Sequence, residues 1–189
     1  MMSVDRNAAA LAIEAFLRAI GHDPEVLPEL AGTGARVADA FADELCVGYR
    51  IDTQALVAAS VIPAPSPGGL VVVRDIPVTT MCPHHLLPAT GTATIAMLAR
   101  DRIIGLGTFA ALVDAHARRL TLQETIGEGV VRDLFDTLDP IWIGCRLVMA
   151  QACMIVRGKR AFGSRVETVA LRSEIKDVAT VHATLGVGR

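Results

Sequence analysis

Residues 70–99 read LVVVRDIPVTTMCPHHLLPATGTATIAMLA, with two strand-like runs on either side of a short turn. The first run, Leu70–Thr80, is rich in β-branched residues. The second, Thr90–Ala99, alternates between its two sides as a half-buried strand does. The turn between them holds Cys82-Pro83-His84-His85. We therefore predict an antiparallel pair of strands whose connection carries thiol and imidazole groups.

The chain after residue 99 predicts two helices followed by two further strands. The first helix is expected at about Phe109–Arg118. The second shows apolar residues at four-residue steps from Leu122 and ends before Pro140. The strands are expected at Ile141–Val156 and Ser164–Leu171, because both are rich in apolar and β-branched residues. From residue 174 onward the pattern indicates only a short helix and a loose end.

The chain before residue 70 predicts helices and then a boundary. An amphipathic helix should begin after Ser3 as N-cap and end at Gly21, and a second should begin near Thr33. The Pro- and Gly-rich run Pro63–Gly69 suits a loop. The element order predicts an α+β fold. We expect four segments: a helical region (1–62), a Pro/Gly loop (63–69), a mixed domain (70–173) and a tail (174–189).

Composition excludes several classes of protein. The chain has 189 residues, 52% of them hydrophobic, and a formal charge of -2, so a core is expected and a nucleic-acid binder is not. No apolar run approaches the roughly 20 residues that span a bilayer, and the N-terminus lacks the layout of a signal peptide. A cytoplasmic protein is expected, in which the four cysteines are not paired as disulfides.

The turn at residues 82–85 suggests a metal site. Cys82 and His85 are three residues apart, so a tight turn can aim both at one point, and zinc accepts thiolate and imidazole together. Catalytic zinc sites keep three protein ligands, and Cys153 on the predicted third strand is the best candidate for the third. The alternative is that both cysteines are buried thiols and the two histidines form a surface turn.

A set of motifs in a fixed order resembles the GTP cyclohydrolase I family, of which this chain would be a divergent member. The match runs from about Arg36 to Leu171. The motifs are Val73-Arg74-Asp75-Ile76, Cys82-x-His84-His85, Ile104-Gly105-Leu106, Gln123-Glu124 and Cys153-x-x-x-Arg157-Gly158. The resemblance implies that residues 70–173 form a catalytic domain with the tunnelling fold, a ββααββ unit whose antiparallel sheets join into a ring. It also implies a homo-oligomer, a decamer of two stacked pentamers, with active sites at subunit interfaces.

The same resemblance implies a role for each matched residue. Cys82, His85 and Cys153 would bind Zn²⁺, which activates a water for attack on C8 of guanine. His84 would shuttle protons, and Glu124, assisted by Gln123, would hold the guanine edge. Arg36 and Arg157 would contact the triphosphate. No organic cofactor is implied.

Some of these residues also have a structural explanation. Glu124 could merely favour the start of a helix, and Arg36 and Arg157 could be surface ion-pair partners. Cys46 and Cys145 match nothing functional, so core packing is expected for both. Two further histidines, His116 and His182, are expected to be solvated residues of a helix or the tail and not ligands.

Three departures from the family pattern affect the expected chemistry. Gln151 stands where the family has a second catalytic histidine, and glutamine cannot exchange a proton near pH 7. On a strand, Gln151 and Cys153 would share a face, so the amide should still enter the site. Residues 107–111 read GTFAA, where the family supplies a hydroxyl and two cations for the phosphate tail. The last strand carries Arg165, which is a possible substitute cation.

We therefore predict a zinc-dependent cyclohydrolase that converts GTP to 7,8-dihydroneopterin triphosphate and formate, at the entrance to folate or pterin synthesis. One alternative is a specialised homologue that opens a less phosphorylated or different purine and stops at the formamidopyrimidine. Another is a non-catalytic oligomer that binds a pterin or purine. Retention of all three metal ligands favours an enzyme over the second alternative.

Overall fold

The computed structural model describes residues 4–66, 69–174 and 178–188. The chain divides into two compact units, Met1–Arg50 and Ile51–Arg189. The loop expected at residues 63–69 lies inside the second unit, and two of its residues are outside the described ranges, as is the expected N-cap Ser3.

The first unit is helical, as expected. Its main helices are α1 (Arg6–Ala19) and α2 (Thr33–Ala40). Asp5 caps α1 by accepting a hydrogen bond from the Ala8 N–H at 2.9 Å. Gly34 allows the two helices close contact, because a Cβ there would lie 2.5 Å from the Ala10 carbonyl oxygen. The remaining short helices are η1 (Pro28–Leu30), η2 (Phe41–Leu45) and η3 (Val47–Arg50).

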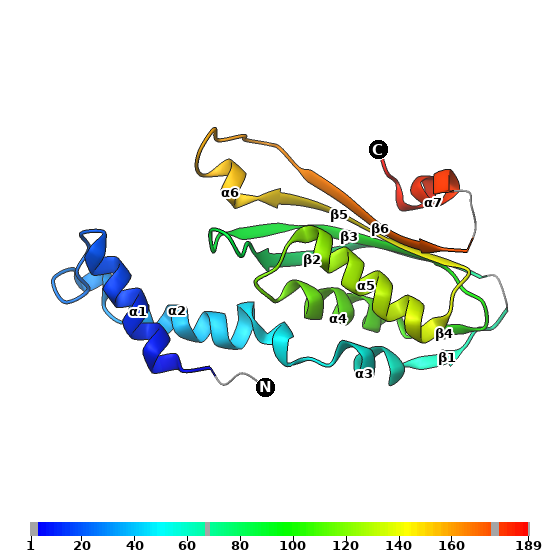
Figure 1. Cartoon of the computed structure of the whole chain (residues 1–189), viewed down its shortest axis with the longest axis horizontal. Coiled ribbons are helices and arrows are strands. Elements are labelled where there is room, and N and C mark those ends of the chain that lie inside the picture. The colour runs from blue at the N-terminus through cyan, green and yellow to red at the C-terminus, as the bar shows by residue number, and fades with distance from the viewer. Residues whose placement is uncertain (1–3, 67–68, 175–177, 189) are drawn as a thin grey trace. The chain divides into compact units, whose positions relative to one another are not determined.

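The second unit is built on a four-stranded antiparallel sheet in the order β2-β3-β5-β6. The strands are β2 (Leu70–Met81), β3 (Pro88–Leu98), β5 (Trp142–Gln151) and β6 (Val166–Ser173). Figure 1 shows these strands lying side by side. All four predicted strands are therefore present, with ends that differ by a few residues from those predicted.

Two short elements interrupt the ββααββ order expected from the sequence. Strand β4 (Arg102–Ile104) follows β3 and pairs with β1 (Val61–Pro63) in a separate small sheet. A one-turn helix, α6 (Ala152–Ile155), separates β5 from β6. Both elements are too short to show a periodicity, which is why the sequence did not predict them.

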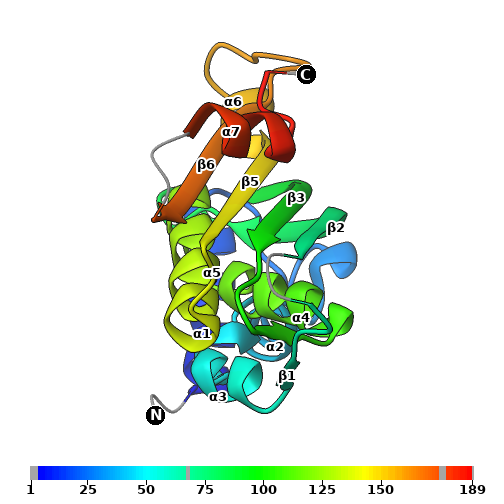
Figure 2. The same cartoon turned by 90° about the vertical axis from the view of Figure 1, so that its right-hand side faces the viewer.

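The helices of the second unit lie on the two faces of the sheet (Figure 2). Helices α4 (Leu106–Ala117) and α5 (Gln123–Leu138) bury one face, and α3 (Thr53–Ala58) packs against both helices. Helix α7 (Val178–Leu185), in the region where a short helix and a loose end were expected, covers Ala96 and Trp142 on the other face. Among the described residues, no helix is both long enough and apolar enough to cross a membrane.

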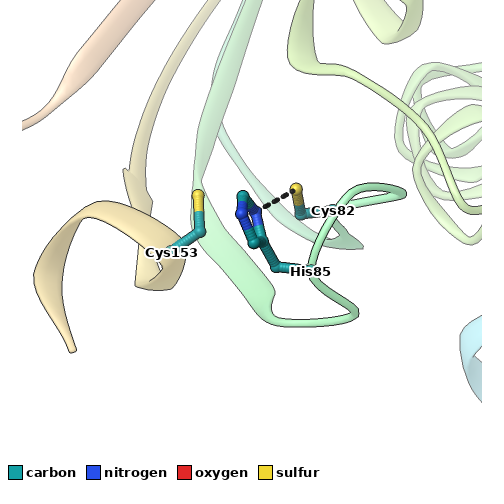
Figure 3. Close-up of side chains that lie close together, drawn as sticks. All are labelled: Cys82, His85 and Cys153. Atoms are coloured by element: carbon teal, nitrogen blue, oxygen red, sulfur yellow. Dashed lines mark hydrogen bonds between the residues drawn. The ribbon is translucent and has the colours of Figure 1, made fainter. Parts of the chain in front are cut away.

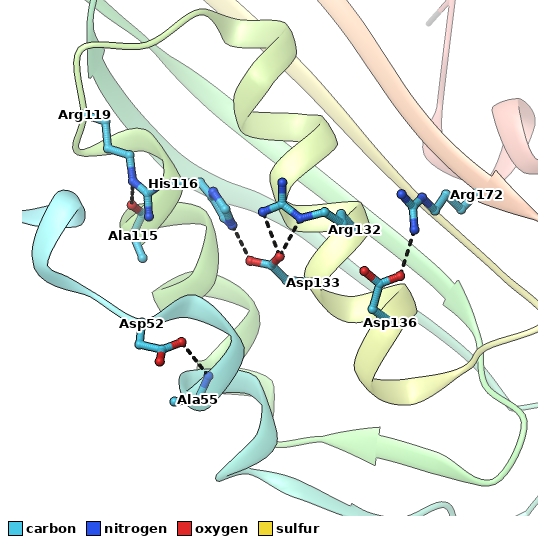
Figure 4. A network of polar contacts seen from close by, with 9 residues as sticks. All are labelled: Asp52, Ala55, Ala115, His116, Arg119, Arg132, Asp133, Asp136 and Arg172. Carbon is cyan, nitrogen blue, oxygen red and sulfur yellow. Dashed lines mark hydrogen bonds and ion pairs between the residues drawn. The ribbon is translucent and has the colours of Figure 1, made fainter.

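A buried polar network joins α4 and α5 (Figure 4). It extends to α3 through Thr53. His116 is only 5% exposed, so the prediction that it is solvated was wrong. Its Nε2 donates to Oδ2 of the fully buried Asp133 at 2.8 Å. Asp133 also accepts from Arg132, at 2.9 and 3.0 Å, and from Thr53. The imidazole fits because Gly129 faces it, where a Cβ would lie 2.5 Å from Nδ1.

We expect Asp133→Ala to lower the free energy of unfolding by about 3 kcal/mol, because it leaves buried donors without an acceptor. The matched control is Asp136→Ala on the same helix, whose carboxylate pairs with Arg172 at 2.8 Å but is 47% exposed. That variant should lose less than about 1 kcal/mol. Urea unfolding followed by circular dichroism measures both. Equal losses in the two variants would contradict a stabilising role for the buried network.

Stability should also fall as the pH drops. Burial lowers the pKa of His116, and the hydrogen bond to Asp133 offsets this only in part. Burial raises the pKa of Asp133, but hydrogen bonds from Thr53, His116 and Arg132 outweigh it, so the net shift is downward. Below about pH 6.5, and for Asp133 below about pH 4, the unfolded chain therefore binds protons that the folded chain does not. His116→Gln should flatten the loss of stability between pH 7 and 5, and an unchanged slope would contradict this assignment.

Candidate active site

The turn after β2 is held by backbone hydrogen bonds that fix its two ends. The Cys82 N–H donates to the Leu87 carbonyl and the Leu86 N–H donates to the Cys82 carbonyl, both at 2.9 Å. Leu86 adopts φ 52°, a left-handed conformation that is uncommon for leucine. This closed turn sets the positions of Cys82 and His85, as the spacing predicted.

The segment between α4 and α5 lies beside the end of β2. Thr80 Oγ1 donates to the Arg119 carbonyl at 3.2 Å, and the Thr121 N–H donates to the Met81 carbonyl at 3.2 Å. These contacts bring the first turn of α5 next to the turn at residues 82–87. A pocket of about 220 Å³ lies there. Its lining comes from three parts of the chain: Thr80, Cys82 and His84; Thr121, Leu122, Gln123 and Glu124; Gln151, Cys153 and Val166.

Cys82, His85 and Cys153 form a group that could hold a metal ion (Figure 3). Their ligand atoms all lie within 4.8 Å of one another, and Cys82 Sγ is 3.8 Å from His85 Nδ1. A tetrahedral zinc ion with Zn–S of about 2.3 Å and Zn–N of about 2.1 Å needs roughly 3.6 Å between these two atoms. The donor set and the spacing therefore fit zinc, and three protein ligands leave a fourth position.

Cys153 lies in the one-turn helix α6, so the prediction that it lies on a strand was wrong. Strand β5 ends at Gln151, whose partner is Ala89; the one β3 residue beyond Ala89 is Pro88, which has no backbone N–H to donate to the ladder. Gln151 and Cys153 nevertheless both line the pocket. Burial raises the pKa of the Cys153 thiol, as does the neighbouring Cys82, while Arg157 opposes the shift. A bound metal cation reverses this balance, because a coordinating thiol is deprotonated.

Arg157 contacts the imidazole of His85. Its Nη1 lies 3.0 Å from His85 Nε2. A guanidinium has only N–H donors, so this contact forms with the tautomer in which Nε2 is unprotonated and Nδ1 carries the proton. A metal ion on Nδ1 requires the other tautomer, whose Nε2–H cannot accept from Arg157, so this contact and metal binding through Nδ1 exclude each other. Arg157 therefore lies beside the metal-ligand group and is exposed, with its charge close to the pocket.

Gln151 and Gln123 are joined by a side-chain hydrogen bond. Gln151 Nε2 donates to Gln123 Oε1 at 2.8 Å. Gln123 is buried at the first position of α5, and its Nε2 donates to the carbonyl oxygens of Leu147 at 3.1 Å and Val166 at 3.0 Å. The side chain of Gln123 thus bridges β5 and β6 beside the pocket.

The other predicted site residues occupy different places. His84 is exposed, lines the pocket and lies edge-on to His85, with ring centroids 6.3 Å apart. Glu124 also lines the pocket and is exposed in the first turn of α5, where a carboxylate additionally favours the helix. Arg36 belongs to the first unit, where it donates to the Ala31 carbonyl at 2.9 Å and to Thr33 Oγ1 at 3.0 Å.

Four lining residues were not predicted: Thr80, Thr121, Leu122 and Val166. A signal existed for three of them. Thr80 lies two residues before Cys82, on the same side of the strand, and the other two directly precede Gln123. Val166 begins β6, and no local pattern links it to the site.

Comparison with known proteins adds a decisive observation. The family model described as GTP cyclohydrolase I matches residues 9–186. The chain belongs to the GTP cyclohydrolase I family. The GTP cyclohydrolase 1 of Leptospira biflexa is 34% identical over 171 residues, which cover 90% of this chain and 92% of that protein. The GTP cyclohydrolase 1 of Acetivibrio thermocellus is 33% identical over 181 residues, covering 95% of each.

Among solved structures, that of the archaeosine synthase QueF-Like in the apo form aligns with 58% of this chain and 98% of its own. The TM-score is 0.48 and the identity 17%. Membership of the GTP cyclohydrolase I family confirms the resemblance inferred from the motifs. One further expectation agrees with the structure: Cys145 is fully buried, and burial raises the pKa of its thiol to about 12. Cys46, for which core packing was also expected, is only half-buried.

Proposed function

We propose that the protein is a zinc-dependent cyclohydrolase that opens the imidazole ring of a guanine nucleotide by hydrolysis at C8. The observation that carries this proposal is the Cys82, His85 and Cys153 group beside a pocket that also presents His84 and Glu124. The names of the relatives, GTP cyclohydrolase 1, support GTP as the substrate. The products would be 7,8-dihydroneopterin triphosphate and formate.

In this proposal each pocket residue has a separate task. Zinc, when bound by Cys82, His85 and Cys153, supplies a Lewis acid that lowers the pKa of a water ligand towards neutrality. The Glu124 carboxylate accepts hydrogen bonds from the guanine ring N–H and exocyclic amine. The exposed His84 imidazole takes up and returns protons at the reacting ring, because histidine is the side chain suited to proton exchange under physiological conditions.

Gln151 makes hydrolysis of the formamide the slow step. A carboxamide donates and accepts hydrogen bonds but does not change its protonation near pH 7. Its place in the pocket next to Cys153 therefore supplies orientation without general acid–base catalysis. The ring-opened formamide should accumulate to a greater extent than it would with a histidine at residue 151.

A second candidate is a specialised homologue that acts on a less phosphorylated guanine compound. The first turn of α4 favours it: no cation lies there, Leu106 is 69% exposed and Phe109 is buried in the core. Arg157, beside His85, and Arg36 remain as our proposed contacts for a phosphate tail. A charged hydrogen bond contributes about 1.5–3 kcal/mol, so fewer cations mean weaker triphosphate binding.

We also propose that the protein is a homo-oligomer, a decamer of two pentamers. The support is that β2 and β6 are the two edges of the four-stranded sheet, where backbone donors and acceptors can pair with another copy. Sedimentation velocity tests this: a single species of about ten chains supports the decamer, and a stable monomer overturns it.

The test of function is incubation of the zinc-loaded protein with GTP, GMP, guanosine and guanine in turn, with formate assay and mass spectrometry. We expect formate from GTP, with a ring-opened formamide preceding the pterin. Turnover of only a less phosphorylated compound would establish the specialised homologue. No turnover, together with ligand binding that survives removal of zinc, would favour a non-catalytic pterin- or purine-binding oligomer.

A further inference from the structure

The side chain of Gln123 is fixed on three sides. It is 4% exposed, and its terminal amide contacts two backbone carbonyl oxygens and one side chain, that of Gln151. A backbone carbonyl oxygen only accepts hydrogen bonds. The atom of Gln123 that faces Leu147 and Val166 must therefore be the amino nitrogen. Its partners thus fix which end of the amide is nitrogen and which is oxygen.

The orientation of the Gln123 amide also fixes the orientation of the Gln151 amide. With the nitrogen of Gln123 turned to the two strands, its oxygen faces Gln151. That oxygen can only accept, so Gln151 must present its amino nitrogen to Gln123. The carbonyl oxygen of Gln151 is then directed away from Gln123. Among the described residues, no hydrogen bond to this oxygen is formed, and Gln151 lines the pocket.

We propose that Gln123 is a positioning residue that sets the direction of the Gln151 carboxamide, so that Gln151 offers its carbonyl oxygen to the pocket and selects ligands with an N–H donor there. This inference rests on the proposed function and deepens it. N7 of an intact guanine nucleotide carries a lone pair and no hydrogen. The formamide formed by ring opening carries an N–H, so the pocket complements the opened ring better than the closed one.

Two nucleotides that differ at N7 test this selection without turnover. GTP has an acceptor at N7, whereas 8-oxo-GTP has an N–H at N7 and a carbonyl at C8. Their dissociation constants are measured on metal-free protein by calorimetry. The preference for 8-oxo-GTP over GTP should fall about ten-fold in Gln151→Met, the value of one lost hydrogen bond, and by a similar factor in Gln123→Met.

Gln54 supplies the matched control. It is the only glutamine of the sequence besides Gln123 and Gln151 and is exposed on α3, so Gln54→Met should leave the preference unchanged. If Gln151→Met leaves the preference unchanged, Gln151 does not select the donor. If Gln151→Met lowers it and Gln123→Met does not, Gln123 is not the positioning residue.

A spectroscopic measurement keeps the inference testable if Gln123→Met does not fold or if neither nucleotide binds. The chain has three glutamines, so labelling glutamine side chains with ¹⁵N and ¹³C gives three amide signals in solid-state NMR of sedimented protein. The Gln151 nitrogen should lie close to the Gln123 carbonyl carbon. The reverse contact, from the Gln123 nitrogen to the Gln151 carbonyl carbon, would overturn the assignment. Failure of both nucleotides to bind would count against the proposed function and not against this orientation.

Discussion

Cys82→Ser and Cys153→Ser are each expected to remove the bound zinc and to abolish formate release from a guanine nucleotide. Each substitution leaves two strong protein ligands where catalytic zinc sites keep three. Hydroxyl oxygen is a much weaker zinc ligand than thiolate, so the metal affinity should fall by several orders of magnitude. Metal content per chain after dialysis against a chelator, measured by mass spectrometry, checks the expectation alongside a formate assay.

The matched control for these variants is Cys46→Ser. Cys46 is a half-buried thiol of the first unit and lies outside the metal-ligand group. This variant should keep its zinc and its activity. If Cys82→Ser retains one zinc per chain at the same chelator concentration, the metal is held elsewhere.

Gln151→His is expected to speed formate release by about 10²–10⁴-fold, the usual contribution of a well-placed general acid or base. An imidazole N–H can donate to Gln123 Oε1 as the glutamine amide does, since that oxygen accepts at 2.8 Å. The second ring nitrogen then faces the pocket with its lone pair. Formate release should acquire a dependence on a group with a pKa near 6.5, which the unaltered protein lacks at this residue.

Rapid-quench kinetics across pH 5.5–8.5, with the formamide and formate measured separately, distinguish this effect from tighter binding. Ring opening itself should change little. Gln54→His places the same side chain on an exposed face of α3 and should leave both steps unchanged. A Gln151→His variant that releases formate no faster would show that formamide hydrolysis does not wait for a proton at residue 151.

The main strands and the turn that carries Cys82 and His85 could be predicted because their sequence patterns are local. The β-branched run at Leu70–Thr80 and the Cys82–His85 spacing each lie within a dozen residues, which is the range over which periodicity and turn chemistry act. The end of β5 could not be predicted in this way. The apolar pattern continues past Gln151, but a strand extends only as far as its neighbour β3 offers partners.

The contacts that the sequence did not predict join residues that lie far apart in the chain. Nothing near His116 in the sequence indicates that Asp133, on the next helix, accepts a hydrogen bond from its imidazole in the core. Likewise, the bond between Gln123 and Gln151 joins residues 28 positions apart. The sequence predicted that both glutamines belong to the site. Which atom each presents depends on the carbonyl oxygens of β5 and β6, and so on the folded sheet.

Helix α5 links the lining of the pocket to the stability of the core, two properties that selection would otherwise adjust separately. Its first turn carries Gln123 and Glu124 at the pocket, and Asp133 on the same rigid helix lies about 15 Å further along, in the interior network. A substitution that shifts this helix to suit a new substrate therefore also disturbs the buried carboxylate. Laboratory evolution towards other purines should accordingly succeed more often through the turn after β2 and the chain beyond Cys153 than through α5.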